Sequence, residues 1–128
     1  MARDLAPLFS PRAIAVFGAS ADPRRLGSTV LRNLLASSFK GHVYPVGRSG
    51  GEVQGLTCLT SAEALPEGVD LAYLAIPAES IVETVRQCAD RGVRAVIVGA
   101  SGFAESGEEG KARQAALAQV VRETGVMV

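Results

Sequence analysis

The residues of this sequence that are best suited to bind a ligand lie in a turn where a strand is expected to meet a helix. An apolar run breaks at Gly18, and a helical pattern begins just after Gly27. Such a turn places backbone N–H groups and the positive end of the helix dipole where an anion can bind. Ser20 adds a hydroxyl donor, and Arg24 and Arg25 can add positive charge. The turn therefore predicts a phosphate site, the alternative being a tight strand-to-helix turn that binds nothing.

Three other segments with similar chemistry follow later apolar runs. Residues 47–51 form a flexible, donor-rich loop that includes Arg48, Pro77 ends an apolar run, and residues 99–102 form a third loop with glycines. If each run is a strand of one parallel sheet, all these segments meet at the edge formed by the carboxyl ends, where α/β domains bind ligands. This convergence of distant segments predicts a single binding crevice.

Apolar runs alternate with amphipathic helical patterns along the chain, as they do in α/β domains. Strands are expected at 13–17, 42–46, 69–76 and 94–98, with a short edge strand at 56–59 and the start of a last strand at 126–128. Helices are expected at 28–38, from residue 78 or 79 to a stop at Gly92, and at 105–124, where Leu117, Val120, Val121 and Thr124 face inward. Right-handed crossovers then give a Rossmann-like, three-layer α/β domain with a parallel sheet, in the strand order 3-2-1-4-5-6.

Length and composition fit one domain with a substantial core. The chain has 128 residues, 48% of them hydrophobic, and its 13 basic and 13 acidic residues balance. A neutral chain gives no reason to expect nucleic acid or a membrane as a partner, so any anion site must be local. We find neither a signal peptide nor an apolar run long enough to cross a bilayer. The two cysteines indicate reduced thiols in the cytoplasm.

The dinucleotide NAD fits the expected crevice poorly. Its fingerprint has three closely spaced glycines, whereas Gly18 is followed by a longer gap to Gly27. NAD sites also have an acidic residue after the second strand to hold the ribose hydroxyls, and here Arg48 stands in that region. An arginine suits a phosphate on the ribose, which both NADP and coenzyme A carry. No residue is suited to managing hydride transfer, which weakens the nicotinamide interpretation further.

Four motifs follow one another along the chain, and together they cover nearly its whole length. They are SPRAIAVFGAS at 10–20, GHVYPV at 41–46, VDLAYLAIPA at 69–78 and SGFAE at 101–105. Together they resemble the N-terminal CoA-binding domain of NDP-forming acyl-CoA synthetases. That group includes acetate–CoA ligase (ADP-forming) and is related to the succinyl-CoA synthetase α subunit. The same domain also begins some protein lysine acetyltransferases.

The resemblance implies that the crevice binds coenzyme A or acyl-CoA. It assigns a CoA phosphate to the turn after the first strand, the adenosine end to the loop after the second, and pantetheine or pyrophosphate to the loop at 100–102. The implied binding residues are Phe17, Gly18, Ala19, Ser20, Gly27, Pro45, Val46, Gly47, Arg48, Ser49, Ile76, Pro77, Ala100, Ser101 and Gly102. The family usually has Asn-Pro-Lys at 47–49, where this chain has Gly-Arg-Ser, so Arg48 is expected to replace the lysine one residue early.

The resemblance also implies that the chemistry resides outside this chain. The family pattern continues beyond Val128 toward a phosphohistidine and a grasp domain. We therefore expect residues 1–128 to be a single binding module from the N-terminal part of a longer acid–CoA ligase (NDP-forming), without a catalytic residue of its own. The other domains or subunits of that enzyme would be its partners. Two alternatives stay open: a domain that regulates an acetyltransferase, and a Rossmann module that binds NAD(P).

Several residues of types that often act in catalysis or metal binding have simpler, structural interpretations here. His42 starts a strand at the edge away from the crevice, Cys58 and Cys88 lack an activating neighbour, and no cluster has the spacing of metal ligands. Gly18 is interpreted as leaving space for the phosphate. On that interpretation Gly18→Ala keeps the fold and only reduces affinity, whereas Gly18→Val abolishes CoA binding.

Overall fold

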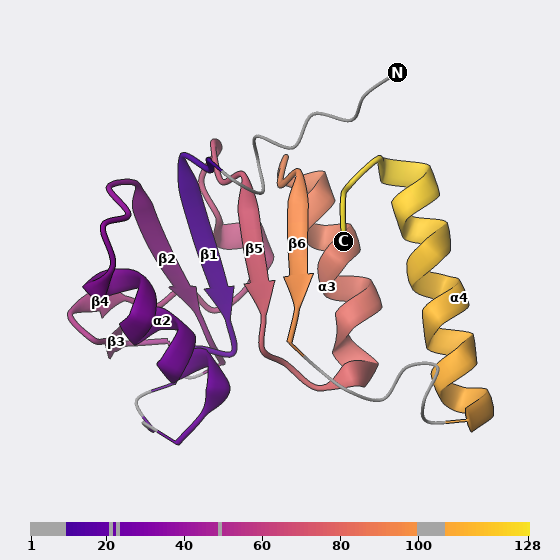
Figure 1. Ribbon diagram of the computed structural model, residues 1–128, viewed down its shortest axis with the longest axis horizontal. Helices are drawn as coiled ribbons and strands as arrows, with labels where there is room; N and C mark the ends of the chain where they lie inside the picture. The colour runs from indigo at the N-terminus through magenta and orange to yellow at the C-terminus, as the bar shows by residue number, and fades with distance from the viewer. Residues whose placement is uncertain (1–9, 21, 23, 49, 100–106) are drawn as a thin grey trace.

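The computed structural model describes residues 10–20, 22, 24–48, 50–99 and 107–128, and it has a parallel sheet with helices on both faces (Figure 1). The order of the parallel strands is β2 (His42–Val46), β1 (Ala13–Phe17), β5 (Leu71–Leu74) and β6 (Ala95–Val98). Isolated parallel bridges extend the sheet at both edges, from Leu59 to Val46 and from Met127 to Ala95. Counted with these bridges, the order is the expected 3-2-1-4-5-6, and the Rossmann-like α/β fold is confirmed.

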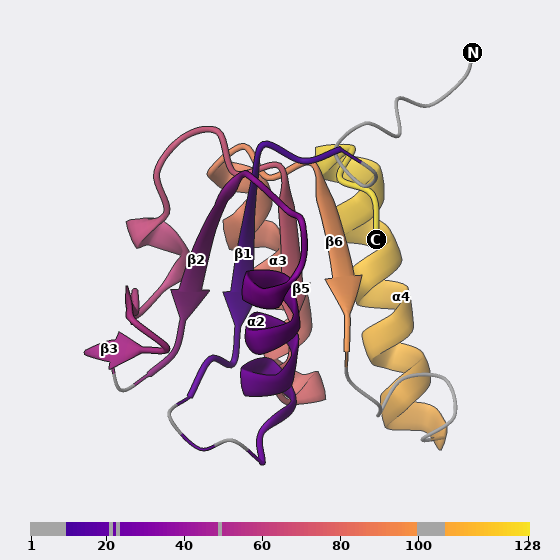
Figure 2. The same ribbon diagram turned by 60° about the vertical axis from the view of Figure 1, so that its left-hand side comes forward.

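Helices cover the two faces of the sheet unequally. α2 (Leu26–Ala36) lies on one face, whereas α3 (Ala78–Asp90) and α4 (Gly107–Thr124) lie on the other (Figures 1 and 2). Leu31 joins α2 to a buried apolar cluster on its face, and Ile81 joins α3 to a larger cluster on the opposite face. Burial of apolar surface contributes about 25 cal/mol per Å², so these clusters hold the crossovers in place. The carboxyl ends of the strands consequently share one edge.

β1 is one of the two central strands of the sheet, and all five of its residues are buried. Its side chains alternate between the two clusters: Ala15 and Phe17 enter the one under α3, and Ile14 and Val16 enter the one under α2. A strand covered on both faces must be apolar throughout, which is what the sequence has there. The turn that follows Phe17 therefore lies at the middle of the carboxyl edge.

A short hairpin takes the place of most of the expected edge strand. β3 (Glu52–Val53) and β4 (Leu56–Thr57) pair antiparallel through a two-residue turn. Gln54 has φ +50° and Gly55 has φ +83°, the left-handed values of a type I′ turn. The Gln54 amide donates to a carbonyl of α2 at 3.0 Å, which holds the hairpin against that helix. Of the expected strand, Leu59 alone bridges to the main sheet.

Two details of the helices differ from the expectation. α2 begins at Leu26 rather than at residue 28, because Arg25 has the extended backbone of an N-cap residue (φ −75°, ψ 143°) and Gly27 is already helical. Thr124 does not face inward: it is exposed at the end of α4, where its hydroxyl donates to the Val120 carbonyl at 2.7 Å. The buried side of α4 ends one turn earlier than its apolar pattern indicates.

At the amino edge of the sheet, an ion pair ties the start of β1 to the start of β5. Asp70, which is 5% exposed, accepts hydrogen bonds from the backbone N–H, the Nε and a terminal nitrogen of Arg12, at 2.8, 2.9 and 2.8 Å. The side-chain hydrogen bond from Arg12 holds the pKa of Asp70 below its usual range, although burial acts in the opposite direction. This pair anchors the edge opposite to the expected crevice.

Candidate functional site

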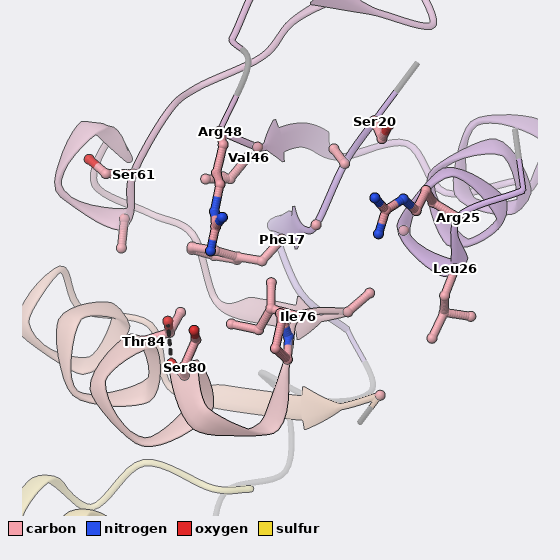
Figure 3. A pocket seen from close by; sticks show the side chains of 18 of the residues that line it. Phe17, Ser20, Arg25, Leu26, Val46, Arg48, Ser61, Ile76, Ser80 and Thr84 are labelled. Atoms are coloured by element: carbon pink, nitrogen blue, oxygen red, sulfur yellow. Dashed lines mark hydrogen bonds between the residues drawn. The ribbon is translucent and has the colours of Figure 1, made fainter. Parts of the chain in front are cut away.

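A cavity of about 650 Å³ opens at the carboxyl edge of the sheet, where the sequence predicts the crevice. Segments that follow β1, β2 and β5 line it, together with the start of α2 and one face of α3 (Figure 3). The predicted site residues around it are Phe17, Gly18, Ala19, Ser20, Gly27, Val46, Gly47, Arg48, Ile76 and Pro77. The predicted residues Ser49, Ala100, Ser101 and Gly102 lie outside the described residues. Gly99, just before them, also lines the cavity.

Pro45 is a predicted site residue that the structure places away from the cavity wall. It is fully buried within β2, and its carbonyl accepts a hydrogen bond from the Leu59 N–H at 2.8 Å. Its ring nitrogen therefore faces the outer edge of the sheet, where a strand tolerates the missing donor. Pro45 shapes the strand that leads to the cavity and does not contact the cavity itself.

Backbone hydrogen bonds attach the glycine turn after β1 to the end of β2. The N–H groups of Gly18 and Ala19 both donate to the Val46 carbonyl, at 2.9 and 3.1 Å. Gly18 has φ +86°, and a Cβ at this position would clash with the backbone carbonyl of Ala75. The interpretation that the missing side chain of Gly18 leaves space for a phosphate is wrong, because Ala75, directly after β5, occupies that space and the fold itself requires a glycine. Gly18→Ala consequently cannot leave the fold undisturbed.

The first turn of α2 provides donors that the glycine turn cannot. Gly27 lets the helix approach the Gly18 carbonyl so closely that a Cβ would clash with it. This turn lines the cavity, and the first N–H groups of a helix have no intrahelical acceptor. The Ser28 N–H already donates to the Arg25 carbonyl at 3.1 Å, so Leu26 and Gly27 are the residues whose N–H groups remain for a ligand. The buried Ser28 holds the preceding loop in place, since its hydroxyl oxygen lies 2.6 Å from the Ser20 carbonyl and 2.7 Å from the Asp22 carbonyl. The positive end of the α2 dipole thus faces the cavity.

Two guanidinium groups enter the cavity from opposite sides. Arg25, the N-cap residue of α2, and Arg48, which follows β2, both point into it in Figure 3. Within the described part of the chain, neither group has a hydrogen bond to an acid, and no aspartate or glutamate lines the cavity. Arg24 turns away to Asp22, with Nε 3.1 Å from Oδ1, and lowers the pKa of that carboxyl. The cavity therefore suits an anion with charge at two separated points.

One face of α3 forms a polar wall that the sequence analysis missed. Ser80, Thr84 and Gln87 line the cavity and are half-buried. The Thr84 hydroxyl donates to the Ser80 carbonyl at 2.7 Å. The available signal is their spacing of four and three residues, which places them on one helical face beside the buried Ile81 and Val85. Periodicity alone identifies such a face but not the cavity that it meets.

The cysteines and the histidine take no part in this cavity. Cys58 and Cys88 are free, buried thiols, and burial raises the pKa of both, to about 12 for Cys88. His42 starts β2 at the far edge of the sheet, with its ring 6.2 Å from that of Tyr44.

Among the residues described, no group of three or more histidine, cysteine, aspartate or glutamate side chains could hold a metal ion. In the same part of the chain, no helix combines the length and the apolar character needed to cross a membrane.

Comparison with known sequences links the chain to CoA enzymes. Residues 12–128 match the sequence model of the CoA binding domain. A trans-feruloyl-CoA synthase from an unknown prokaryotic organism is 43% identical over 121 residues, which are 94% of this chain and 17% of that protein. Acetate–CoA ligase (ADP-forming) II subunit alpha from Pyrococcus furiosus is 39% identical over 120 residues, which are 94% of this chain and 26% of that subunit.

Comparison with solved structures gives the same relationship. The dinucleotide forming acetyl-coenzyme A synthetase 1 of Ca. Korarchaeum cryptofilum, solved in complex with phosphate and ADP, superposes with a TM-score of 0.89. The two chains are 38% identical, and the match covers 96% of this chain and 26% of that one. This chain therefore spans 17% to 26% of the length of these three relatives.

Proposed function

The chain belongs to the CoA binding domain family, and from this premise we propose that the cavity at the carboxyl edge of its sheet binds coenzyme A. Coenzyme A is the ligand that the sequence predicts, and the family bears its name. The observation that carries the proposal is the pair of Arg25 and Arg48, whose guanidinium groups enter from opposite sides of a cavity with no acid among its described residues. Coenzyme A has a matching pattern of charge, a 5′-diphosphate and a 3′-phosphate on either side of one ribose.

We assign the diphosphate to the end of the cavity at α2. The first N–H groups of α2, at Leu26 and Gly27, meet there with Ser20, Arg25 and the positive end of the helix dipole. Ser20 Oγ accepts a hydrogen bond from the Asp22 N–H at 3.0 Å, which leaves the hydroxyl proton to donate. Hydrogen bonds to a charged phosphate are roughly twice as strong as those between neutral groups, so this end provides the main anchor.

We assign the 3′-phosphate of the ribose to Arg48. This arginine follows β2, the position at which NAD sites have an acidic residue for the ribose hydroxyls. The family's usual lysine is absent, because Ser49 stands in its place. The direction of the Arg48 guanidinium, into the cavity, supports the replacement of that lysine by an arginine one residue earlier.

We propose further that the complete protein is an acid–CoA ligase (NDP-forming), in which this domain holds coenzyme A while other domains or subunits perform the reaction. The names of the relatives support this role, since they are a CoA synthase and an ADP-forming ligase subunit. They favour the ligase over the alternative of a domain that regulates an acetyltransferase. The two free thiols support the cytoplasm as its compartment, where cysteines stay reduced.

Calorimetric titration of the chain with coenzyme A, NADP and NAD tests the binding proposal. Coenzyme A is expected to bind most tightly, because it has both the diphosphate and a 3′-phosphate. NADP is expected to bind less well, since its phosphate is on the 2′ oxygen, and NAD least well. Thermal melts provide a second measurement, because a ligand stabilises the folded chain by mass action. Tighter binding of NAD or NADP than of coenzyme A would overturn the proposal.

A further inference from the structure

We infer that the polar face of α3 formed by Ser80, Thr84 and Gln87 recognises the adenine base of the bound ligand. The cavity would then select an aminopurine, with its exocyclic amine, over an oxopurine, with a carbonyl in that place. This inference rests on the proposed binding of coenzyme A and adds a determinant of base specificity to it. Nothing in the charge pattern of Arg25 and Arg48 distinguishes one purine from another.

The three side chains form a continuous wall on one side of the cavity. They follow each other at intervals of four and three residues, so they share one face of α3. In Figure 3 the hydroxyl groups of Ser80 and Thr84 point toward the cavity and toward the guanidinium group of Arg48. Ile76 and Phe17 provide apolar surface next to this wall. A flat, largely apolar base with a hydrogen-bonding edge matches such a combination of surfaces.

Thr84 presents only lone pairs to the cavity. Its hydroxyl donates its single proton to the Ser80 carbonyl at 2.7 Å, as threonines within helices often do. The oxygen can therefore accept a hydrogen bond but cannot donate one in this rotamer. It suits the exocyclic amine of adenine, which is a donor, and it opposes the carbonyl of hypoxanthine or guanine. A phosphate, which has only acceptors at neutral pH, is also a poor neighbour for this oxygen.

Gln87 has an amide that is nearly free to pair with a base. Its described contact is with Glu83, where Nε2 lies 3.5 Å from Oε1, at the long limit of a hydrogen bond. Glutamine amides pair with adenine through two hydrogen bonds, accepting from the amine and donating to a ring nitrogen. With Ser80 as an additional hydroxyl, the wall offers acceptors and a donor along one line. This arrangement is complementary to the edge of adenine.

Titration with two nucleotides that differ at one group tests the inference. Adenosine 3′,5′-bisphosphate represents the nucleotide end of coenzyme A, and inosine 3′,5′-bisphosphate replaces its amine by a carbonyl. The unmodified chain is expected to prefer the adenosine compound by about five- to hundredfold, the range for one well-formed base contact. Thr84→Val and Gln87→Leu are each expected to reduce this ratio toward one. Arg48→Gln is the matched control, since it is expected to weaken both compounds by the same factor and leave the ratio unchanged.

The outcomes separate this inference from the proposed function. Equal affinity of the unmodified chain for the two bisphosphates, together with tight binding of coenzyme A, would overturn the inference alone. An unchanged ratio in both α3 variants would do the same, provided that their thermal melts show a folded chain. A 2′-deoxy analogue whose affinity falls while the base ratio stays at one would assign the wall to the sugar instead. Failure of coenzyme A itself to bind would overturn the proposed function, and the inference with it.

Discussion

At the scale of the residue, adjacent arginines have different roles that follow from their local backbone. Arg24 pairs with Asp22 on the surface, where its side chain is 88% exposed, and Arg25 is the N-cap residue of α2 and faces the cavity. Arg48 approaches from the other side, without a hydrogen-bonded acid among the described residues. The binding proposal thus depends on two specific cations rather than on the net charge of the chain, which is zero.

Neutralising Arg48 is expected to weaken coenzyme A much more than dephospho-CoA. A hydrogen bond to a charged group is worth about 1.5–3 kcal/mol, so Arg48→Gln should reduce the affinity for coenzyme A by roughly ten- to hundredfold. Dephospho-CoA lacks the 3′-phosphate and should lose little. Calorimetry with both ligands measures the difference, and Arg24→Gln is the control, because that guanidinium lies outside the cavity. Equal losses for the two ligands would show that Arg48 does not contact the 3′-phosphate.

Substitution of Gly18 is expected to destabilise the chain in the absence of any ligand. The left-handed backbone at φ +86° costs an alanine about 1–2 kcal/mol, and the clash with the Ala75 carbonyl adds to it. Gly92→Ala is a matched control, since Gly92 has φ +88° but a Cβ added there would meet no atom within 4 Å. Urea denaturation should therefore show a larger loss of unfolding free energy for Gly18→Ala than for Gly92→Ala. Equal losses would mean that the chain relieves the clash with the Ala75 carbonyl at no cost in free energy, and that packing does not require the glycine.

At the scale of the element, the two edges of the sheet have separate tasks. The carboxyl edge carries the cavity, whereas the amino edge is held by Arg12 and Asp70, which join β1 to β5. β1 takes part in both, because one end of it is anchored and the other ends in the glycine turn. Loss of the anchor is expected to change stability rather than the ligand contacts.

Asp70→Asn is expected to reduce the stability of the chain in a pH-dependent way. The folded state lowers the pKa of Asp70, so the carboxylate contributes its full stabilisation above the ordinary value of about 3.9. This contribution is lost as the pH falls through the lowered, folded-state pKa. At pH 7 the variant should lose about 1.5–3 kcal/mol of unfolding free energy. The difference from the unmodified chain should shrink as the pH falls below about 4.

Denaturation at several pH values measures this effect, and Glu123→Gln provides the control. Glu123 Oε2 lies 2.8 Å from a terminal nitrogen of Arg86, but both side chains are nearly half exposed, so that variant should lose less unfolding free energy than Asp70→Asn. A loss for Asp70→Asn that does not depend on pH would assign the role of Asp70 to packing rather than to its charge.

At the scale of the whole molecule, the sequence is sufficient to predict the sheet and the edge that carries the cavity. The strands expected at 13–17 and 42–46 coincide with β1 and β2. β1 is an apolar run that is buried throughout, and a glycine directly follows each of the two strands. The start of α2 is not predictable in the same way. It depends on the close approach of Gly27 to the Gly18 carbonyl, a contact between backbones that residue types do not reveal.

The cavity itself is predictable only in part. The loops that follow strands are expected to meet, and those within the described residues do so. The wall on α3 escapes prediction, because helical spacing shows that Ser80 and Thr84 share a face without showing what that face meets. The choice between Arg24 and Arg25 depends on which of them is the N-cap residue. The role of Gly18 depends on Ala75, which is distant in sequence.

The two arginines and the polar wall of the cavity come from stretches of chain that do not overlap. The segment from β1 through α2 to β2 and Arg48 contributes both arginines, whereas the wall at Ser80–Gln87 belongs to the unit that follows β5. On the assignments proposed above, preference for a phosphate and preference for a base are therefore inherited through separate parts of the sequence. A descendant could exchange one nucleotide base for another by substitutions on a single helix while the phosphate anchors stay intact. A change of ligand from coenzyme A to one without the 3′-phosphate would require substitutions only in the loop after β2.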